Sequence, residues 1–234
     1  MRRGNRWFGP VVAAAWIHAG ASLGQASSAP ANGGPAPAPD ATISSDELEM
    51  RDNGAASIFK GHVVLTQQPY VLHADRMVQT KATQLVEAFG HIRATSVSPS
   101  GEHYLATGER ASYDPTQKLT ELWQDARVVR WETAADTSPI VAVAEHFTAS
   151  DLNHTIEAHG RVRIEQGKTF VVESDEAKYV EAEKVIYFWG LSPVSVHYQG
   201  PKQLANFHGR KGQVYLSPKR ARLIDQVQGR VIPL

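Results

Sequence analysis

The sequence predicts an all-β protein built from about six two-stranded repeats, on the basis of three observations. An acidic or equivalent position recurs about every 29 to 36 residues, a period typical of stacked supersecondary units. A small residue, mostly glycine, follows each of these positions by about 15 residues and starts a branched, apolar stretch. Apolar and polar residues alternate in segments such as 160–165 and 194–198, as in half-buried strands. The first column of the repeat reads Asp46, Asp75, Glu109, Glu145, Asp175 and Arg210, and the second reads Gly61, Gly90, Ala126, Gly160, Gly190 and Gly229.

The first 26 residues differ from the rest of the chain. Three arginines precede an apolar run at 7–17, and the small residues at 24–26 fit a cleavage site. This pattern predicts a secretory signal peptide over residues 1–26. The alternative is a retained membrane anchor over residues 7–23, although about 17 residues are marginal for spanning a bilayer.

Residues 27–41 are rich in alanine, proline, serine and glycine, and they predict a flexible linker ahead of a folded domain at 42–234. Without the three arginines of the leader, 21 of the 24 basic residues remain against 24 acidic ones, so the net charge is about −3. That balance does not favour nucleic-acid binding. The chain has no cysteine, which excludes disulfides, thiolate zinc sites and a lipidated cysteine anchor.

Turn sequences separate the alternating segments of the body, as at 52–54, 98–101 and 114–115, which favours many short antiparallel strands. The segment Glu173 to Val185 has helix-forming composition, yet it lies in register with the other repeats. We therefore expect strand, turn and strand there, and no substantial helix in the mature body.

The acid positions and the apolar residues that follow them would need opposite faces of the sheet. Large apolar residues lie two or four positions beyond several acids, so on a regular strand they would share a face with a group that needs water. A bulge or corner near each acid would reverse the facing and resolve the conflict. The residues concerned are Leu48, Met50, Met77, Tyr113, Phe147, Tyr179 and Val214.

Segments 43–50, 59–67, 72–78 and 106–114 together resemble the OstA-like, or LptA, family of periplasmic lipopolysaccharide-transport domains. The resemblance is clearest over residues 42–132 and continues more weakly to about residue 232. It implies an open, twisted β-jellyroll in the periplasm whose interior holds lipid A acyl chains. It also implies edge strands that join head to tail with LptC-like and LptD-like jellyrolls, or with further copies of the chain, in a bridge between the inner and outer membranes.

The resemblance and the strand ladder together predict a lipid-binding apolar interior. Two of its residues occupy matched positions in family motifs, Ile43 and Tyr113, and the others are neighbours in the ladder. Acyl chains need apolar area and no catalytic group, and each buried methylene contributes about 0.8 kcal/mol. The plainer interpretation is that these residues simply form the core. The predicted set is Ile43, Val63, Leu65, Ile92, Tyr113, Val128, Phe147, Val162 and Ile164.

The last repeat departs from the pattern, because bases replace acids at Arg210–Lys211 and at 219–222. A basic edge of this kind would attract lipid A phosphates or an acidic partner edge. The alternative is the solvated face of a capping repeat.

Sequence motifs do not favour an enzyme. The ten histidines are scattered without His-Glu-x-x-His spacing, and the nucleophile elbow and the phosphate-binding loop are both missing from the sequence. We therefore expect no catalytic residues, no metal and no cofactor. Two other functions remain open: an LptC-like jellyroll anchored in the inner membrane, and a β-solenoid that binds or processes envelope polysaccharide. The only aromatic residues that hint at the latter are Trp123, Trp131, Tyr187 and Trp189.

Overall fold

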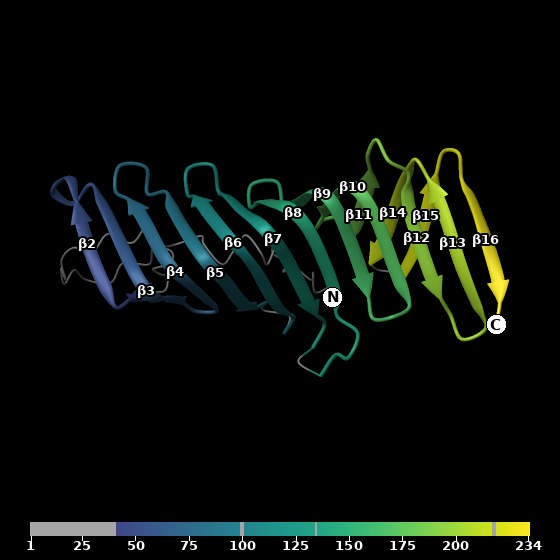
Figure 1. Ribbon diagram of the computed structural model, residues 1–234, viewed down its shortest axis with the longest axis horizontal. Helices are drawn as coiled ribbons and strands as arrows, with labels where there is room; N and C mark the ends of the chain where they lie inside the picture. The colour runs from purple at the N-terminus through teal and green to yellow at the C-terminus, as the bar shows by residue number, and fades with distance from the viewer. Residues whose placement is uncertain (1–40, 99–100, 134, 217–218) are drawn as a thin grey trace, which may run out of the picture.

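Sixteen strands form one open antiparallel sheet, which confirms the predicted all-β jellyroll class (Figure 1). This computed structural model describes residues 41–98, 101–133, 135–216 and 219–234. The predicted signal peptide and nearly all of the predicted linker lie outside these residues. Within the described ranges the only helical element is a short 3-10 turn at Asp52–Gly54, and no helix is long and apolar enough to cross a membrane.

The centre of the sheet is a run of long strands in which each strand pairs with the next. Short turns connect these strands, so neighbours along the chain are neighbours in space. The long strands are β3 Ala56–Gln67, β4 Tyr70–Thr80, β5 Val86–Val97, β6 His103–Asp114, β7 Leu119–Trp131, β8 Ile140–Ser150, β9 Thr155–Gln166 and β10 Phe170–Val180.

At both ends of the molecule the strands are divided in two. The first half of β10 pairs with β12 and its second half pairs with β11, so β11 and β12 are the two halves of one interrupted strand. The same holds for β1 with β2, β13 with β14, and β15 with β16. The divided strands are β1 Thr42–Ser44, β2 Glu47–Arg51, β11 Val185–Trp189, β12 Val194–Gln199, β13 Gln203–Gly209, β14 Lys211–Leu216, β15 Lys219–Ile224 and β16 Gln228–Pro233.

The strands therefore group into six two-stranded units, as the repeat predicted. In chain order the units are β1/β2 with β3, β4 with β5, β6 with β7, β8 with β9, β10 with β11/β12, and β13/β14 with β15/β16. The helix-forming segment 173–185 runs from β10 through a turn into β11. Its helical propensity is overridden by cross-strand pairing on both sides.

Each long strand bends at a bulge, and the two repeat columns mark it. The pairing register shifts between Lys60 and Val63 on β3 and between His73 and Arg76 on β4, with equivalent shifts through to β10. The acid and the glycine of one unit lie side by side there. A Cβ built on Gly61 would lie 2.3 Å from Asp46 Oδ2, and Gly90 stands in the same relation to Asp75. The predicted reversal of facing thus occurs at the acids.

Two members of the second column are corrected by this geometry. In the third unit the left-handed bulge residues are Gln124 and Asp125, so Ala126 corresponds to Val63 rather than to Gly61. In the sixth unit they are Asp225 and Gln226, whereas Gly229 pairs with Phe207 on β13. Neither unit keeps the glycine at the bulge, and in both a small residue lies shortly after it, so spacing alone predicts the wrong position.

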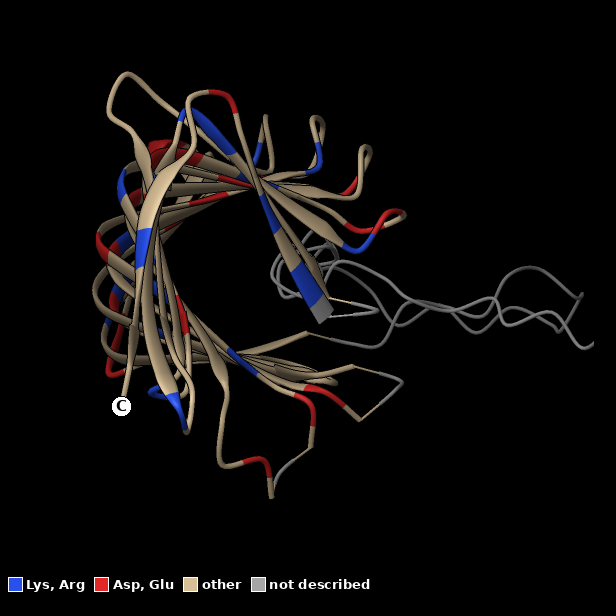
Figure 2. Ribbon diagram, turned by 90° about the vertical axis from the view of Figure 1, so that its right-hand side faces the viewer, with Lys and Arg blue, Asp and Glu red and all other residues tan. Residues whose placement is uncertain are grey.

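The bend divides the sheet into two walls. We call the wall that contains β1, β12, β13 and β16 the first wall, and the wall that contains β2, β11, β14 and β15 the second wall. Strands β3 to β10 cross the bend and contribute one half to each. Viewed down the long axis, the walls meet along one side and stand apart at the other, so the molecule is an open trough (Figure 2).

Candidate functional site: the interior of the trough

Apolar side chains line the inner face of the first wall in rows that cross every unit. The middle row begins with Ile43 opposite Leu65 and continues strand by strand to Phe207 opposite Gly229. Rows of this kind arise because stacked repeats place equivalent residues opposite one another. The row comprises Ile43, Leu65, Leu72, Ala94, Ala106, Val128, Ala142, Ile164, Val172, Val196, Phe207 and Gly229.

The inner face of the second wall carries a matching row next to the bend. It begins at Leu48 on β2 and ends at Leu223 on β15. Pairs of alanines separate the larger side chains along it, and residues of both walls belong to one hydrophobic cluster. The row comprises Leu48, Phe59, Met77, Ala88, Ala111, Leu122, Phe147, Ala158, Ala177, Phe188, Gly212 and Leu223.

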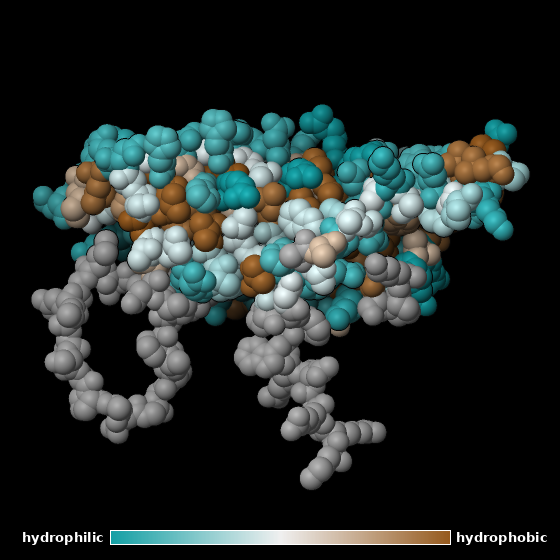
Figure 3. Space-filling view, turned by 90° about the horizontal axis from the view of Figure 1, so that it is seen from below, coloured by the Kyte–Doolittle hydropathy of each residue, from teal (hydrophilic) through white to brown (hydrophobic). Residues whose placement is uncertain are grey.

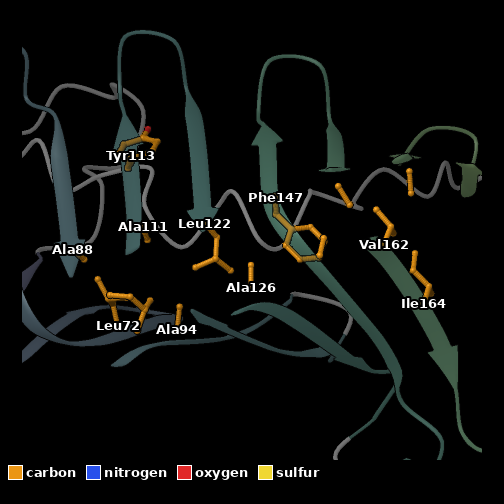
Figure 4. Packing of buried hydrophobic residues seen from close by; sticks show 14 of the residues in the cluster. Leu72, Ala88, Ala94, Ala111, Tyr113, Leu122, Ala126, Phe147, Val162 and Ile164 are labelled. Atoms are coloured by element: carbon orange, nitrogen blue, oxygen red, sulfur yellow. The ribbon is translucent and has the colours of Figure 1, made fainter. Parts of the chain in front are cut away.

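All nine predicted interior residues lie on these inner faces. Seven are buried, and Ile43 and Val128 are half-buried and pack against the same hydrophobic cluster. Figure 4 shows Leu72 and Ala94 below, with Leu122, Phe147 and Tyr113 above them, all between the ribbons of the two walls. Over the N-terminal and central units the interior is therefore filled by side chains.

The C-terminal units differ, because their walls separate and leave a cavity of about 620 Å³. Both walls contribute to it, the first through the ends of β7 to β10 and through β12, β13 and β16, and the second through β14 and β15. A cavity of this size, lined mainly by apolar groups, is typical of a site for a hydrophobic ligand. Its apolar lining includes Ile140, Phe170, Val196, Ala205, Phe207, Val214, Leu216, Leu223, Val227 and Val231.

The predicted set missed this cavity, because it ended at Ile164 although the middle row of the first wall continues to Phe207. The alternation at 194–198 did identify β12 as a strand. The facing of β13 could not be assigned, because its unit lacks both the acid and the glycine that locate the bend.

Toward the mouth, the first wall becomes polar on its inner face. Arg130 pairs with Glu102, and the Tyr104 hydroxyl donates a hydrogen bond to the same carboxylate at 2.6 Å. Burial, followed by the hydrogen bond to Glu102, raises the pKa of Tyr104 well above its usual range. Arg130 also borders the cavity. The trough thus has an apolar floor at the bend and polar groups at its margin.

The outside of the bend carries a series of acid–base contacts. His62 Nδ1 lies 2.7 Å from Asp46 Oδ2, His91 repeats this contact with Asp75, and Arg161 Nε donates to Glu145 at 2.7 Å. The hydrogen bond to Asp46 raises the pKa of His62. These exposed pairs stabilise little on their own, but they fix the side chains that follow the glycines.

The outer face of the second wall carries a stacked row of cationic and aromatic groups. The Arg110 guanidinium lies 5.0 Å from the Trp123 ring centre, and His146 stacks on the same indole at 5.0 Å. Trp123 therefore contacts both of its neighbours in the row, Arg110 and His146. Trp131 belongs to the other wall, where it lies opposite His103. Trp123 and Trp131 therefore do not form one aromatic platform.

Figure 3 shows apolar surface in the middle of one side of the molecule, beneath a hydrophilic margin. Several residues on the outward positions of the first wall are apolar and partly exposed, including Val97 and Val143 at 39% and 37%. An antiparallel sheet usually presents polar groups on its solvated face, so the outer face of the first wall is more apolar than is usual for such a sheet.

Metal binding finds no support in the part of the chain that the structure describes, where no group of three or more His, Asp or Glu side chains is placed to hold an ion. The repeated carboxylates lie one unit apart along the bend. They pair with the residue after the glycine, or accept a backbone N–H as Asp175 does from Ser192 at 2.8 Å.

A comparison with known protein families agrees with the resemblance noted from the sequence. Residues 42–143 match the family described as LptA/(LptD N-terminal domain) LPS transport protein. Among solved structures, one match is LptH, the LptA homologous periplasmic component of the lipopolysaccharide transport device of Pseudomonas aeruginosa. The identity is 14%, the match covers 69% of this chain and 96% of that chain, and the TM-score is 0.30. No curated protein matches the chain. Residues 42–143 of the chain are thus similar to the family of LptA and LptD N-terminal lipopolysaccharide transport proteins, and the repeats of the sheet continue beyond this match to residue 233.

Proposed function

We propose that the protein is a periplasmic carrier that holds the acyl chains of lipopolysaccharide in its trough and forms part of a bridge between the inner and outer membranes. The observation that carries the proposal is the continuous apolar inner face, which opens into the cavity of about 620 Å³ between the C-terminal units. Each acyl methylene that leaves water for this face contributes about 0.8 kcal/mol. Because the C-terminal units are hollow, we place the first lipid contacts there rather than at Val63, which is buried.

Photo-crosslinking in cells tests this proposal. A photoreactive residue at Phe207, which lines the cavity, should crosslink to lipopolysaccharide. The same residue at Asn206, the adjacent exposed position on the outer face of β13, should not. Equal crosslinking from both positions, or none from Phe207 in a folded protein, would contradict the carrier function. The mass of the mature chain in the same experiment distinguishes the cleaved carrier from the anchored, LptC-like alternative.

The edges of the sheet suit head-to-tail association with a second jellyroll. Strands β2 and β15 each pair on one side only among the described strands. An unpaired strand edge accepts a further antiparallel strand. If β15 of one copy meets β2 of the next with Leu223 opposite Leu48, Arg222 falls opposite Glu49 and Ala221 opposite Met50. That register continues the inner apolar rows and covers Leu48 and Met50, which are 54% and 66% exposed.

A charge exchange at this contact gives a second test. We expect Arg222→Glu to weaken self-association about two- to fivefold, because like charges directly opposite on a sheet repel. Combining it with Glu49→Arg restores the opposite-charge pair and should recover the association constant. The measurement is sedimentation equilibrium at low salt. If the two substitutions together weaken the association constant by the product of their separate effects, this register is excluded.

A further inference from the structure

Two carboxyl groups at the mouth of the trough are buried without hydrogen-bond partners. Asp151 lies in the turn after β8, and Glu181 lies in the turn after β10. All four of their carboxyl oxygens are inaccessible and accept no hydrogen bond from the described residues. The Thr120 hydroxyl, on the inner face of β7, is buried and unpartnered in the same way. Native proteins leave few such groups, so each of them calls for a physical explanation.

The charged and titratable groups around each carboxyl are few. Asp151 is influenced by Lys118 from the β6–β7 turn and by His154 from its own turn, and it acts in return on Tyr70 and Tyr113. These groups come from β4, from β6 and from two turns of the second wall.

Glu181 has a similar set of neighbours. His154 Nδ1 lies 3.6 Å away, too far for a hydrogen bond. Lys184 in the same turn and Glu102 from the first wall also act on it, and Glu181 in turn acts on Tyr179 of β10. Glu102 opposes ionisation, while His154 and Lys184 favour it.

Some of these influences act from one wall to the other at the mouth. Tyr70 begins β4 in the first wall, yet it lies close enough to Asp151 of the second wall to be influenced by its charge. In the same way, Glu102 of the first wall acts on Glu181 of the second. The two buried carboxyls therefore lie at a margin where charges of one wall act on groups of the other.

Burial is the largest influence on both groups. It raises the pKa of Asp151 from 3.8 to about 6 and raises the pKa of Glu181 in the same direction. An ionised carboxylate without hydrogen bonds is costly in a site that excludes water, whereas the neutral form is tolerated. Separation of the walls would admit water and remove this penalty.

We propose that separation of the two walls at the mouth is coupled to ionisation of Asp151 and Glu181: the closed trough favours the protonated form of both carboxyl groups, and the open trough favours the ionised form, with the protons released to solvent. This inference rests on the proposed function, because a carrier must open its mouth to admit acyl chains along the length of the trough.

The sign of the effect follows from the raised pKa. A carboxyl whose pKa is raised in the closed state stabilises that state below its ordinary pKa, and the stabilisation is lost as the pH rises through the raised value. The open population should therefore grow between about pH 4 and pH 7. Each pKa unit between the two states changes the ratio of open to closed molecules about tenfold.

Spin labels across the mouth measure this ratio directly. The chain has no cysteine, so Gln68→Cys on the first wall and Asn153→Cys on the second, both exposed positions, give one defined pair. We expect the longer distances measured by pulsed electron resonance to gain population as the pH rises from 4.5 to 7.5. Distances that do not change with pH in this labelled protein would overturn the proposal.

Neutral variants assign the effect to the two carboxyls. Asp151→Asn with Glu181→Gln mimics the protonated state and should remain closed and independent of pH. The matched control is Glu183→Gln, an exposed carboxyl in the same turn as Glu181, which should leave the pH dependence intact. Persistent pH dependence in the neutral variant would overturn the proposal.

Because this readout needs no lipid, it stands apart from the carrier function. Opening with pH but without lipid crosslinks at Phe207 would reject the carrier and keep the coupling. Lipid crosslinks at Phe207 without a pH effect would support the carrier function and reject the coupling.

Discussion

Ile92→Asp should lower the free energy of unfolding by about 4 kcal/mol or more, because it removes a buried branched side chain and places a carboxylate in the filled part of the trough. Ile92 is 2% exposed and faces inward beside the bend of β5. Urea denaturation followed by circular dichroism measures the change.

The matched control is Arg93→Asp, at the next residue on the outer face of the same strand. Arg93 is exposed, so this change should cost no more than about 0.5 to 1 kcal/mol. The two variants introduce the same residue one position apart. The difference between their free energies of unfolding therefore depends mainly on whether the side chain lies on the inner or the outer face of the sheet. Similar losses of stability in both would mean that the inner and outer faces of β5 have been assigned wrongly.

The facing of the strands is also where sequence reasoning succeeded and where it failed. Alternation and repeat spacing identified the strands, the six units and the bulges at the acids. All nine predicted interior residues lie on the inner faces because most units keep the glycine that locates the bend. Where that glycine is replaced, as by Gln124 and Asp225, the columns were misaligned.

The cavity and the buried carboxyls could not be predicted from the sequence for a different reason. Both depend on residues that are far apart in the chain: the lining of the cavity, for example, runs from Arg130 to Val231. Tyr70 and Asp151 are far apart in the sequence, yet the charge of Asp151 acts on Tyr70 in the folded chain. In the sequence, Asp151 and Glu181 are ordinary turn residues, and nothing distinguishes them from exposed carboxylates such as Glu183.

The bend itself depends on glycine, so Gly90→Ala should cost about 2 to 4 kcal/mol of unfolding free energy. Gly90 has φ +74°, and an added Cβ would lie 2.3 Å from Asp75 Oδ2 and 3.0 Å from Asp75 Cβ. Two effects contribute to this cost: the strain of a left-handed backbone conformation on alanine, and the steric overlap of its Cβ with Asp75. A control variant separates them. Gly101 has φ +85° with nothing within 4 Å of an added Cβ, so Gly101→Ala measures the strain alone, about 1 to 2 kcal/mol.

A double-mutant cycle between Gly90→Ala and Asp75→Ala then isolates the overlap. Asp75→Ala removes the carboxylate but keeps its Cβ, so we expect partial relief, with a coupling energy of about 1 kcal/mol in the favourable direction. The Asp75–His91 contact is lost in the single Asp75 variant as well as in the double variant, so it cancels from the cycle to first order. A coupling energy near zero would mean that the acid and the glycine are not packed against one another. In that case the repeated columns would reflect turn chemistry rather than the contact that bends the sheet into a trough.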